Sequence, residues 1–137
     1  MIVHDDYLTL QSKQRREFIN VTAHCREAVT KSGVHNGLLF VMVLHPNAGI
    51  FVGDDEPGVL ADLGKWLETV APERDDYQHG SKFESNAGIH LQAIALGSQI
   101  TLSITGGKLE FGPWQHVIYA ELDGLRPKKI LMKIMGE

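Results

Sequence analysis

The chain has 137 residues, 43% of them hydrophobic and 22% charged, which fits one domain over residues 1–137 with a core of its own. Its net charge of −4, without any basic block, argues against nucleic acid as the main partner. The single cysteine, Cys25, excludes a disulfide within the chain, and the lack of a signal-peptide pattern or of an apolar run of roughly 20 residues predicts a cytoplasmic protein that does not enter a membrane.

The first half of the chain alternates short strands with one helix. A helix is expected over residues 22–31, with Thr22 as its cap, Gly33 at its end and Cys25 packed inside. Strands are expected where polar and apolar side chains alternate or where an apolar run is continuous. These segments are residues 7–10, 17–20, 38–44 and 50–52.

Two helices are predicted in the middle of the chain. Pro57 is suited to the first position of a helix, and leucines then recur at helical spacing until Pro72 stops the pattern. The acids Asp54, Asp55 and Glu56 precede this helix, where its dipole favours negative charge. A Mg²⁺ site is the alternative explanation for these acids. The next helix is expected over residues 86–96, with Gly97 as its cap.

The last forty residues have the alternating pattern of strands. Gly106-Gly107 is a hairpin signal between two of them. The predicted strands are residues 100–104, 108–111, 115–122 and 129–135. Together they suggest a meander of antiparallel strands, so the expected class is α+β dominated by sheet.

Three histidines stand at the edges of predicted elements: His45, His79 and His90. Histidine is the commonest neutral metal ligand and the usual proton carrier near pH 7. The gaps between them match no known zinc motif, and for each histidine alone a structural hydrogen bond is the commoner explanation. Asn86 shares a helix face with His90 and either caps the helix or orients His90 and contacts a ligand. The amides at this helix start would favour a phosphate or carboxylate.

The segment Gly112-Pro-Trp-Gln115 comes just before a long predicted strand. Trp114 suggests a core anchor, with ligand binding as the alternative. Gln115 and Glu121 fall on one face of the strand, but six residues at about 3.3 Å each separate them by roughly 20 Å. Either one of them is structural, or a site lies between subunits.

Taken together, these motifs resemble the YjbQ-like family, whose members are described as secondary thiamine-phosphate synthases. The resemblance runs over the whole chain in the same motif order. The matching segments are His45-Pro-Asn-Ala-Gly49, Tyr77-Gln-His79, Asn86-Ala-Gly-Ile-His90, Gly112-Pro-Trp-Gln115, the acidic Glu121 and the terminal Gly136-Glu137.

The resemblance implies a jelly-roll-like antiparallel β-sandwich with two to three helices, assembled as a homotrimer. It implies an enzyme that joins a pyrimidine diphosphate to a thiazole phosphate and releases pyrophosphate. Catalytic roles would fall to His45, His90 and Gln115. The phosphorylated substrate would contact Asn86, Trp114 and Glu121. A divalent metal ion would be held by His45, His79 and His90.

The chain also departs from the family pattern. Pro46 and Asn47 replace two hydroxyl residues, Gly53 and Pro113 replace polar ones, and Gly80 follows His79. These changes favour a retained ligand or metal site over a retained reaction. Three imidazoles suit a zinc-type ion, whereas a diphosphate leaving group would normally use Mg²⁺. The alternatives are therefore a non-catalytic trimer that binds a metal or small anion, and a metal-dependent hydrolase.

Overall fold

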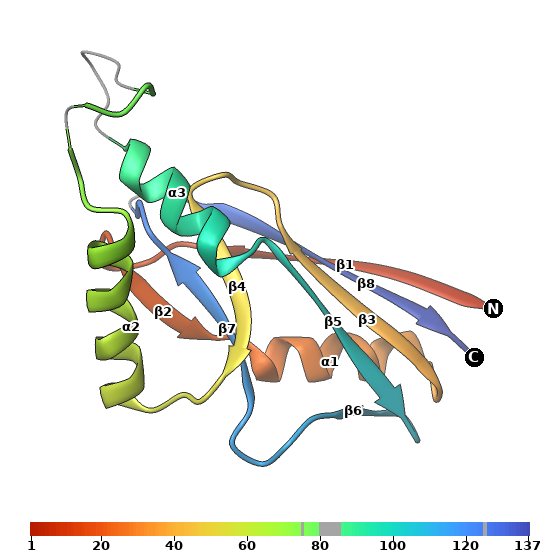
Figure 1. Cartoon of the computed structure of the whole chain (residues 1–137). Coiled ribbons are helices and arrows are strands. Elements are labelled where there is room, and N and C mark those ends of the chain that lie inside the picture. Colours follow the sequence, from red (N-terminus) through yellow and green to blue (C-terminus); the bar gives the residue numbers. More distant parts are fainter. Residues whose placement is uncertain (75, 80–85, 125) are drawn as a thin grey trace.

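A computed structural model describes residues 1–74, 76–79, 86–124 and 126–137 (Figure 1). Within these residues the strands are β1 (Ile2–Leu10), β2 (Glu17–Asn20), β3 (Gly37–Val43), β4 (Ala48–Gly53), β5 (Gln99–Thr105), β6 (Lys108–Glu110), β7 (His116–Glu121) and β8 (Lys128–Gly136). The helices are α1 (Thr22–Ser32), α2 (Pro57–Val70) and α3 (Ala87–Leu96). The predicted α+β class, with antiparallel sheets and three helices, is confirmed.

The strands form a five-stranded sheet in the order β1-β8-β3-β5-β6 and a three-stranded sheet in the order β2-β7-β4. The predicted meander is wrong, because β7 joins the small sheet and β8 returns between β1 and β3. The first strand is also longer than predicted, since all nine residues of β1 pair with β8. Alternation of side chains shows that a segment is a strand, but it does not show which strand lies beside it.

Two hydrophobic cores lie on the two faces of the small sheet. The first fills the space between the sheets and α1, and includes Leu39, Cys25 and Tyr119. The second joins β7 to α2 and α3 through Leu67 and Ile89. Figure 1 shows this layering, with α2 and α3 on the side of β2, β7 and β4 away from the large sheet. The expected packing of Cys25 is confirmed, and its burial raises the pKa of the thiol to about 12.

The start of α1 differs from the prediction. Val21, not Thr22, occupies the N-cap position, and no side chain caps the helix. The Thr22 hydroxyl instead accepts a hydrogen bond of 2.9 Å from the Val117 amide of β7. The predicted helix ends are confirmed at Gly33 and Gly97, both with positive φ. The Gly106-Gly107 turn between β5 and β6 is confirmed as well.

The acids before α2 are held by the protein. The Glu56 carboxylate accepts hydrogen bonds from the Gly58 and Val59 amides at 2.9 and 2.8 Å, and these bonds lower its pKa from the usual 4.5. Asp55 accepts a bond of 2.9 Å from the Asn20 side chain. The helix-end explanation of these acids therefore holds for Glu56, which is the N-cap of α2.

This cap makes stability depend on pH. A carboxylate whose pKa is lowered by folding stabilises the protein above the pKa of its unfolded state, and this stabilisation is lost as pH falls through the folded value. We expect wild type to melt at a higher temperature than Glu56→Gln at pH 7, and the difference to shrink as pH falls below 4.5. Thermal melts followed by circular dichroism at pH 7 and pH 3 measure it. A difference that stays constant over this range would contradict the assignment.

The outer face of the large sheet is covered by none of the described elements. Cross-strand neighbours on it are largely apolar: Met135 stands between Val3 and Leu38, and Leu131 between Tyr7 and Met42. Leu38 and Tyr7 are each about half exposed. The polar exceptions include Lys133, which forms an ion pair of 2.8 Å with Asp5. An apolar sheet face of this kind is typical of a surface that meets another protein chain.

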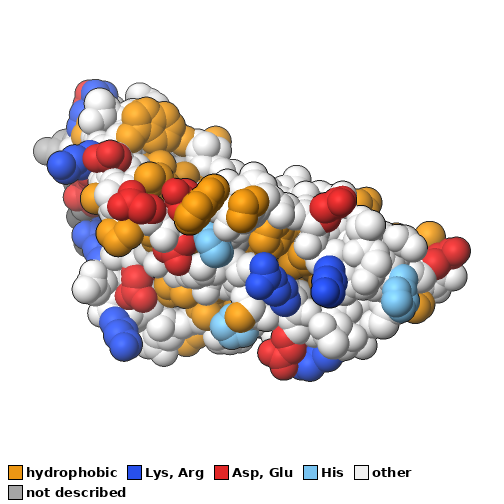
Figure 2. Space-filling view, turned by 90° about the horizontal axis from the view of Figure 1, so that it is seen from below, with side chains coloured by type: hydrophobic (Ala, Val, Ile, Leu, Met, Phe, Trp, Pro, Cys, Tyr) orange, Lys and Arg blue, Asp and Glu red, His pale blue; other side chains and the backbone are white. Residues whose placement is uncertain are grey.

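Charges of both signs are mixed on the face seen in Figure 2, where lysine, arginine and acidic side chains alternate without one dominating. A nucleic-acid-binding surface instead gathers basic residues into a patch or stripe. Among the described residues, no helix is both long and apolar enough to cross a lipid bilayer.

Candidate functional site

The start of α3 is packed tightly against the end of α2, and this contact positions the candidate site. Gly88 lies in the first turn of α3, where an added Cβ would sit 2.9 Å from the Ala71 carbonyl oxygen and 3.0 Å from that of Pro72. Only a glycine allows the two backbones to approach so closely. This contact fixes the start of α3, where Asn86 and His90 lie beside His79.

His79, Asn86 and His90 form one cluster. Asn86 makes no capping bond with its side chain, although it occupies the N-cap position. Its Oδ1 instead lies 3.2 Å from His79 Nε2. The rings of His79 and His90 meet edge to face, with centroids 4.8 Å apart and an angle of 66° between their planes. The capping explanation of Asn86 is therefore wrong, and the contact that its side chain makes is with His79, whereas the expected partner was His90.

His45 reaches the same region from the end of β3. It lines a pocket of about 360 Å³ together with His90. The rest of this wall is made of small or apolar residues of the β3–β4 loop and of α3, among them Ala48, Ala93 and Ile94. The loop also holds Asn47, whose Oδ1 is buried and accepts no hydrogen bond from the described residues. We call this cavity the histidine pocket.

The imidazole of His45 is oriented by a backbone amide. Its Nε2 lies 3.0 Å from the Lys129 nitrogen and accepts that N–H. In a neutral imidazole one nitrogen accepts and the other donates, so Nδ1 carries the proton of His45. The opposite holds for His79, where Nε2–H donates to Asn86 and leaves a lone pair on Nδ1.

These hydrogen bonds test the expected metal site. In this tautomer His79 has its lone pair on Nδ1, and the ring of His90 lies beside it. His45 offers an N–H in this arrangement, which fits a bound anion better than a cation. Among the described residues, no group of three histidine, cysteine, aspartate or glutamate side chains is close enough to hold a metal ion. His45 does not fit as a ligand while it accepts from Lys129, and the pairing of His79 and His90 on one ion stays a prediction.

Trp114 and Gln115 lie in the turn before β7, away from the residues that line the histidine pocket. Trp114 is 76% exposed, so the expected core anchor is wrong. The turn precedes β7, and none of the described elements buries the indole. The Gln115 Oε1 accepts a hydrogen bond of 2.8 Å from the Gly112 amide and stabilises the same turn.

Glu121 is fully buried at the end of β7. Its carboxylate accepts hydrogen bonds from the Tyr119 hydroxyl at 2.8 Å, the Asp123 amide at 3.1 Å and the Lys128 ammonium at 2.7 Å. Burial and the neighbouring carboxylate raise the pKa of Tyr119 above its usual value. The protein thus occupies both oxygens of Glu121. The separation from Gln115 needs no intersubunit site, because Glu121 has a structural role.

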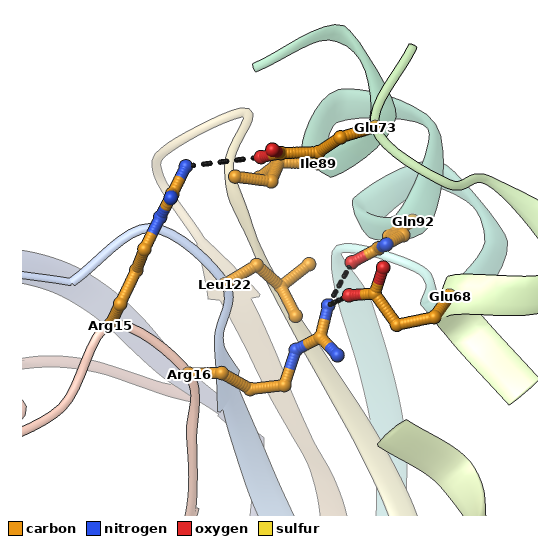
Figure 3. Close-up of a pocket in the computed structure, with 7 residues that line it drawn as sticks. All are labelled: Arg15, Arg16, Glu68, Glu73, Ile89, Gln92 and Leu122. Atoms are coloured by element: carbon orange, nitrogen blue, oxygen red, sulfur yellow. Dashed lines mark hydrogen bonds and ion pairs between the residues drawn. The ribbon is translucent and has the colours of Figure 1, made fainter. Parts of the chain in front are cut away.

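Sequence reasoning missed Lys128, although a signal for it exists. In β8 the apolar residues Ile130, Met132 and Ile134 alternate, and Lys128 belongs to the same face of the strand. A lysine in register with a buried apolar set requires an acidic partner, which Glu121 supplies. Sequence reasoning also missed a second cavity, on the far side of α3 from His90, lined by Arg15, Arg16 and Gln92 among others (Figure 3).

The fold and the histidine pocket define a class of protein: two stacked antiparallel sheets with two helices over the smaller one, and a polar cluster at the start of the second of these helices. The chain belongs to the YjbQ-like family of UPF0047 proteins, whose family model matches residues 6–137. The cluster of His79, Asn86 and His90 comes from the segments Tyr77-Gln-His79 and Asn86-Ala-Gly-Ile-His90, on which the resemblance partly rested.

Relatives agree with this assignment over nearly the whole chain. A UPF0047 protein of Methanothermobacter thermautotrophicus is 33% identical over 137 residues, which is 100% of this chain and 95% of the relative. A crystal structure from Sulfolobus solfataricus, described as a protein of unknown function, has a TM-score of 0.93 at 29% identity and 98% coverage of both chains. One from Clostridium acetobutylicum, described as uncharacterized, has a TM-score of 0.88 at 34% identity, covering 95% of this chain and 99% of that one.

Proposed function

We propose that this protein is an enzyme of the secondary thiamine-phosphate synthase type, which joins a pyrimidine diphosphate to a thiazole phosphate and releases pyrophosphate in the cytoplasm. The observation that carries the proposal is the cluster of His79, Asn86 and His90 beside a pocket that His45 also lines. A cluster of this kind offers several N–H donors and lone pairs to one small phosphorylated ligand.

The reaction needs groups that stabilise a departing diphosphate. As the new bond to the thiazole forms, the bond from the pyrimidine unit to the diphosphate oxygen breaks, and its electron pair leaves with pyrophosphate. Donors aimed at this developing charge lower the barrier. We assign this role to the Nδ1–H of His45, to His90 and to the backbone amides at the start of α3, which the Asn86 side chain leaves uncapped.

A divalent metal ion on His79 and His90 would add positive charge at the leaving group. Imidazole ligands favour a zinc-type ion over Mg²⁺. In the proposed site Asn86 keeps His79 in the tautomer that can bind such an ion, so Asn86 is a positioning residue. Asn47 Oδ1, which accepts no hydrogen bond from the described residues, lies in the loop beside the pocket and is an acceptor suited to an amino group, such as that of an aminopyrimidine.

We further propose that the protein is a homotrimer. A cyclic trimer joins two different surfaces of neighbouring copies. The apolar outer face of the large sheet supplies one, and the exposed turn with Trp114 supplies the other. In this arrangement Trp114 and Gln115 of a neighbouring copy would approach the ligand and position its heterocycle.

The trimer is tested at Leu38, which lies half exposed on the open sheet face. We expect Leu38→Asp to shift the mass in sedimentation equilibrium from three chains to one, because a desolvated carboxylate is costly in an apolar interface. The circular dichroism spectrum should not change. Val59→Asp, on a similarly exposed position of α2, is the matched control and should remain trimeric. A Leu38→Asp protein that keeps the mass of three chains would place the interface elsewhere.

The activity is tested by rescue of a thiamine-phosphate-synthase-deficient strain. Wild type should rescue growth, and His90→Ala should not, since loss of a positioned acid–base or ligand group costs about 100-fold or more in rate. His116→Ala is the control, because His116 starts β7 and does not line the histidine pocket. Equal rescue by His90→Ala would show that the histidine pocket does not carry the reaction. Failure of wild type to rescue growth would exclude the proposed synthase reaction.

The second candidate function is binding of a small anion without catalysis. The N–H that His45 offers to the pocket favours it. A non-catalytic trimer would bind inorganic phosphate through His45 and His90 and fail to rescue the strain. A metal-dependent hydrolase gains less support, because no third metal ligand stands beside His79 and His90 in the described part of the chain. Metal analysis of the purified protein decides whether an ion is present, and less than about 0.1 metal per chain would exclude the metal-bound forms of the site.

A further inference from the structure

The cavity in Figure 3 lies on the face of α3 opposite the histidine pocket and has a volume of about 330 Å³. Its floor is apolar and consists of Ile89 and Leu122, both buried. Charged side chains of both signs surround this floor. In Figure 3 the pair Arg15–Glu73 stands on one side of Leu122, and Arg16–Glu68 on the other. We call this cavity the arginine pocket. Its apolar floor between two ion pairs suits a ligand that has both an apolar part and charged groups.

Arg16 is a fixed wall of the arginine pocket. Its guanidinium forms an ion pair of 2.8 Å with Glu68 and donates to the Gln92 side chain and to the Gly64 carbonyl at 3.3 Å. Gln92 is itself buried and donates to the carbonyl oxygens of Leu67 and Ala71 at the end of α2. These bonds connect the loop of Arg16 to both helices. The Nε of Arg16 remains buried and donates to none of the described residues.

Arg15 is held much more weakly. Its closest contacts to Glu73 and Asp123 are 3.3 and 3.4 Å, longer than the 2.7–2.9 Å that is typical of strong charge-assisted bonds. Arg15 and Glu73 are both about half exposed. An exposed ion pair of this length contributes little to stability, so it opens at little cost. Arg15 and Glu73 are therefore available to a ligand, while Arg16 and Gln92 keep their places.

We propose that the arginine pocket binds a small zwitterion with an aliphatic side chain, of the α-amino acid class. The ligand carboxylate would bind Arg15, and its ammonium would bind Glu73. Its side chain would lie on Ile89 and Leu122. The volume falls within the range of pockets that hold small molecules.

Charge balance selects a zwitterion over a simple ion. An anion that took Arg15 away from Glu73 would leave that carboxylate without its cation, and a cation on Glu73 would leave Arg15 facing a like charge. A ligand with both charges replaces the ion pair of the protein with two new ones, and neither side chain loses its partner. Because Gln92 and His90 point to different faces of α3, this binding is separate from the proposed synthase site.

Binding is tested on the full-length protein with L-leucine as the probe, followed by ¹H–¹⁵N correlation spectra and isothermal titration calorimetry. We expect saturable shifts at the amides of Ile89, Gln92 and Leu122. Two analogues each lack one charge: 4-methylpentanoate has no ammonium and isoamylamine has no carboxylate. Each should bind at least tenfold more weakly than leucine. Absence of shifts with leucine, isoleucine, valine and methionine would overturn the proposal, as would analogues that bind as tightly as leucine.

Two variants test which side chains bind the two charges of the ligand. Arg15→Gln and Glu73→Gln should each weaken leucine binding at least tenfold, since each removes one ligand ion pair and neither side chain is needed for the core. Glu27→Gln is the matched control, because Glu27 is an exposed carboxylate on α1 in an ion pair of 3.4 Å with Lys31. It should bind leucine as wild type does. Leucine binding within twofold of wild type in both pocket variants would show that the site is elsewhere.

Discussion

Replacing Lys128 with methionine is expected to lower the free energy of unfolding by about 3–5 kcal/mol. Lys128 is 3% exposed and its ammonium lies 2.7 Å from Glu121, which is fully buried. Methionine retains the length and the apolar stem but removes the charge. Glu121 would then keep only the Tyr119 hydroxyl and the Asp123 amide, and a carboxylate in that environment lacks the cation that compensates its desolvation.

Urea denaturation followed by tryptophan fluorescence and circular dichroism measures this loss. The double variant Glu121→Gln/Lys128→Met should recover most of it, because both members of a buried pair are then neutral. The control is Lys31→Met, which removes an exposed lysine of α1 and should change stability by less than about 0.5 kcal/mol. A Lys128→Met protein as stable as wild type would mean that water reaches Glu121 in solution.

Gly37→Ala is expected to cost about 3 kcal/mol, at the upper end of what overpacking a core position costs. Gly37 opens β3 beside the end of β8, and a Cβ there would overlap the Met135 carbonyl oxygen and approach Gly136 Cα to 2.8 Å. Both are backbone atoms of a paired strand, so neither can turn aside as a side chain would. Relief requires the two strands to separate where β8 is held between β1 and β3.

Gly64→Ala supplies the contrast within the same chain. Gly64 lies in α2, and the only atom near its added Cβ among the described residues is Arg16 Nη1 at 3.9 Å, an ordinary contact. Alanine is favoured over glycine inside a helix by about 1 kcal/mol. This variant should therefore be more stable than wild type under the same urea titration. Equal losses at Gly37 and Gly64 would show that glycine flexibility, rather than close strand packing, controls the effect.

Part of the candidate site was accessible from the sequence. His45, His79 and His90 were singled out because each stands at the edge of an element, and the structure places the rings of His79 and His90 with centroids 4.8 Å apart. The contact between Asn86 and His79 was not predicted, because helix spacing related Asn86 only to His90. The amide of Lys129 that orients His45 is 84 residues away in the chain, and no local pattern indicates it.

The sequence patterns identified the elements of this protein almost completely. Periodicity, Pro57 and the glycines at helix ends depend on contacts a few residues long, so they can be recognised from neighbouring letters. Strand order, the burial of the Glu121–Lys128 pair, the exposure of Trp114 and the arginine pocket depend on which elements face one another. Arg16 and Gln92 are 76 residues apart, and their contact exists only after α3 has packed against α2 and β7. Such contacts follow from the packing of whole elements, which is why they became visible in the folded chain.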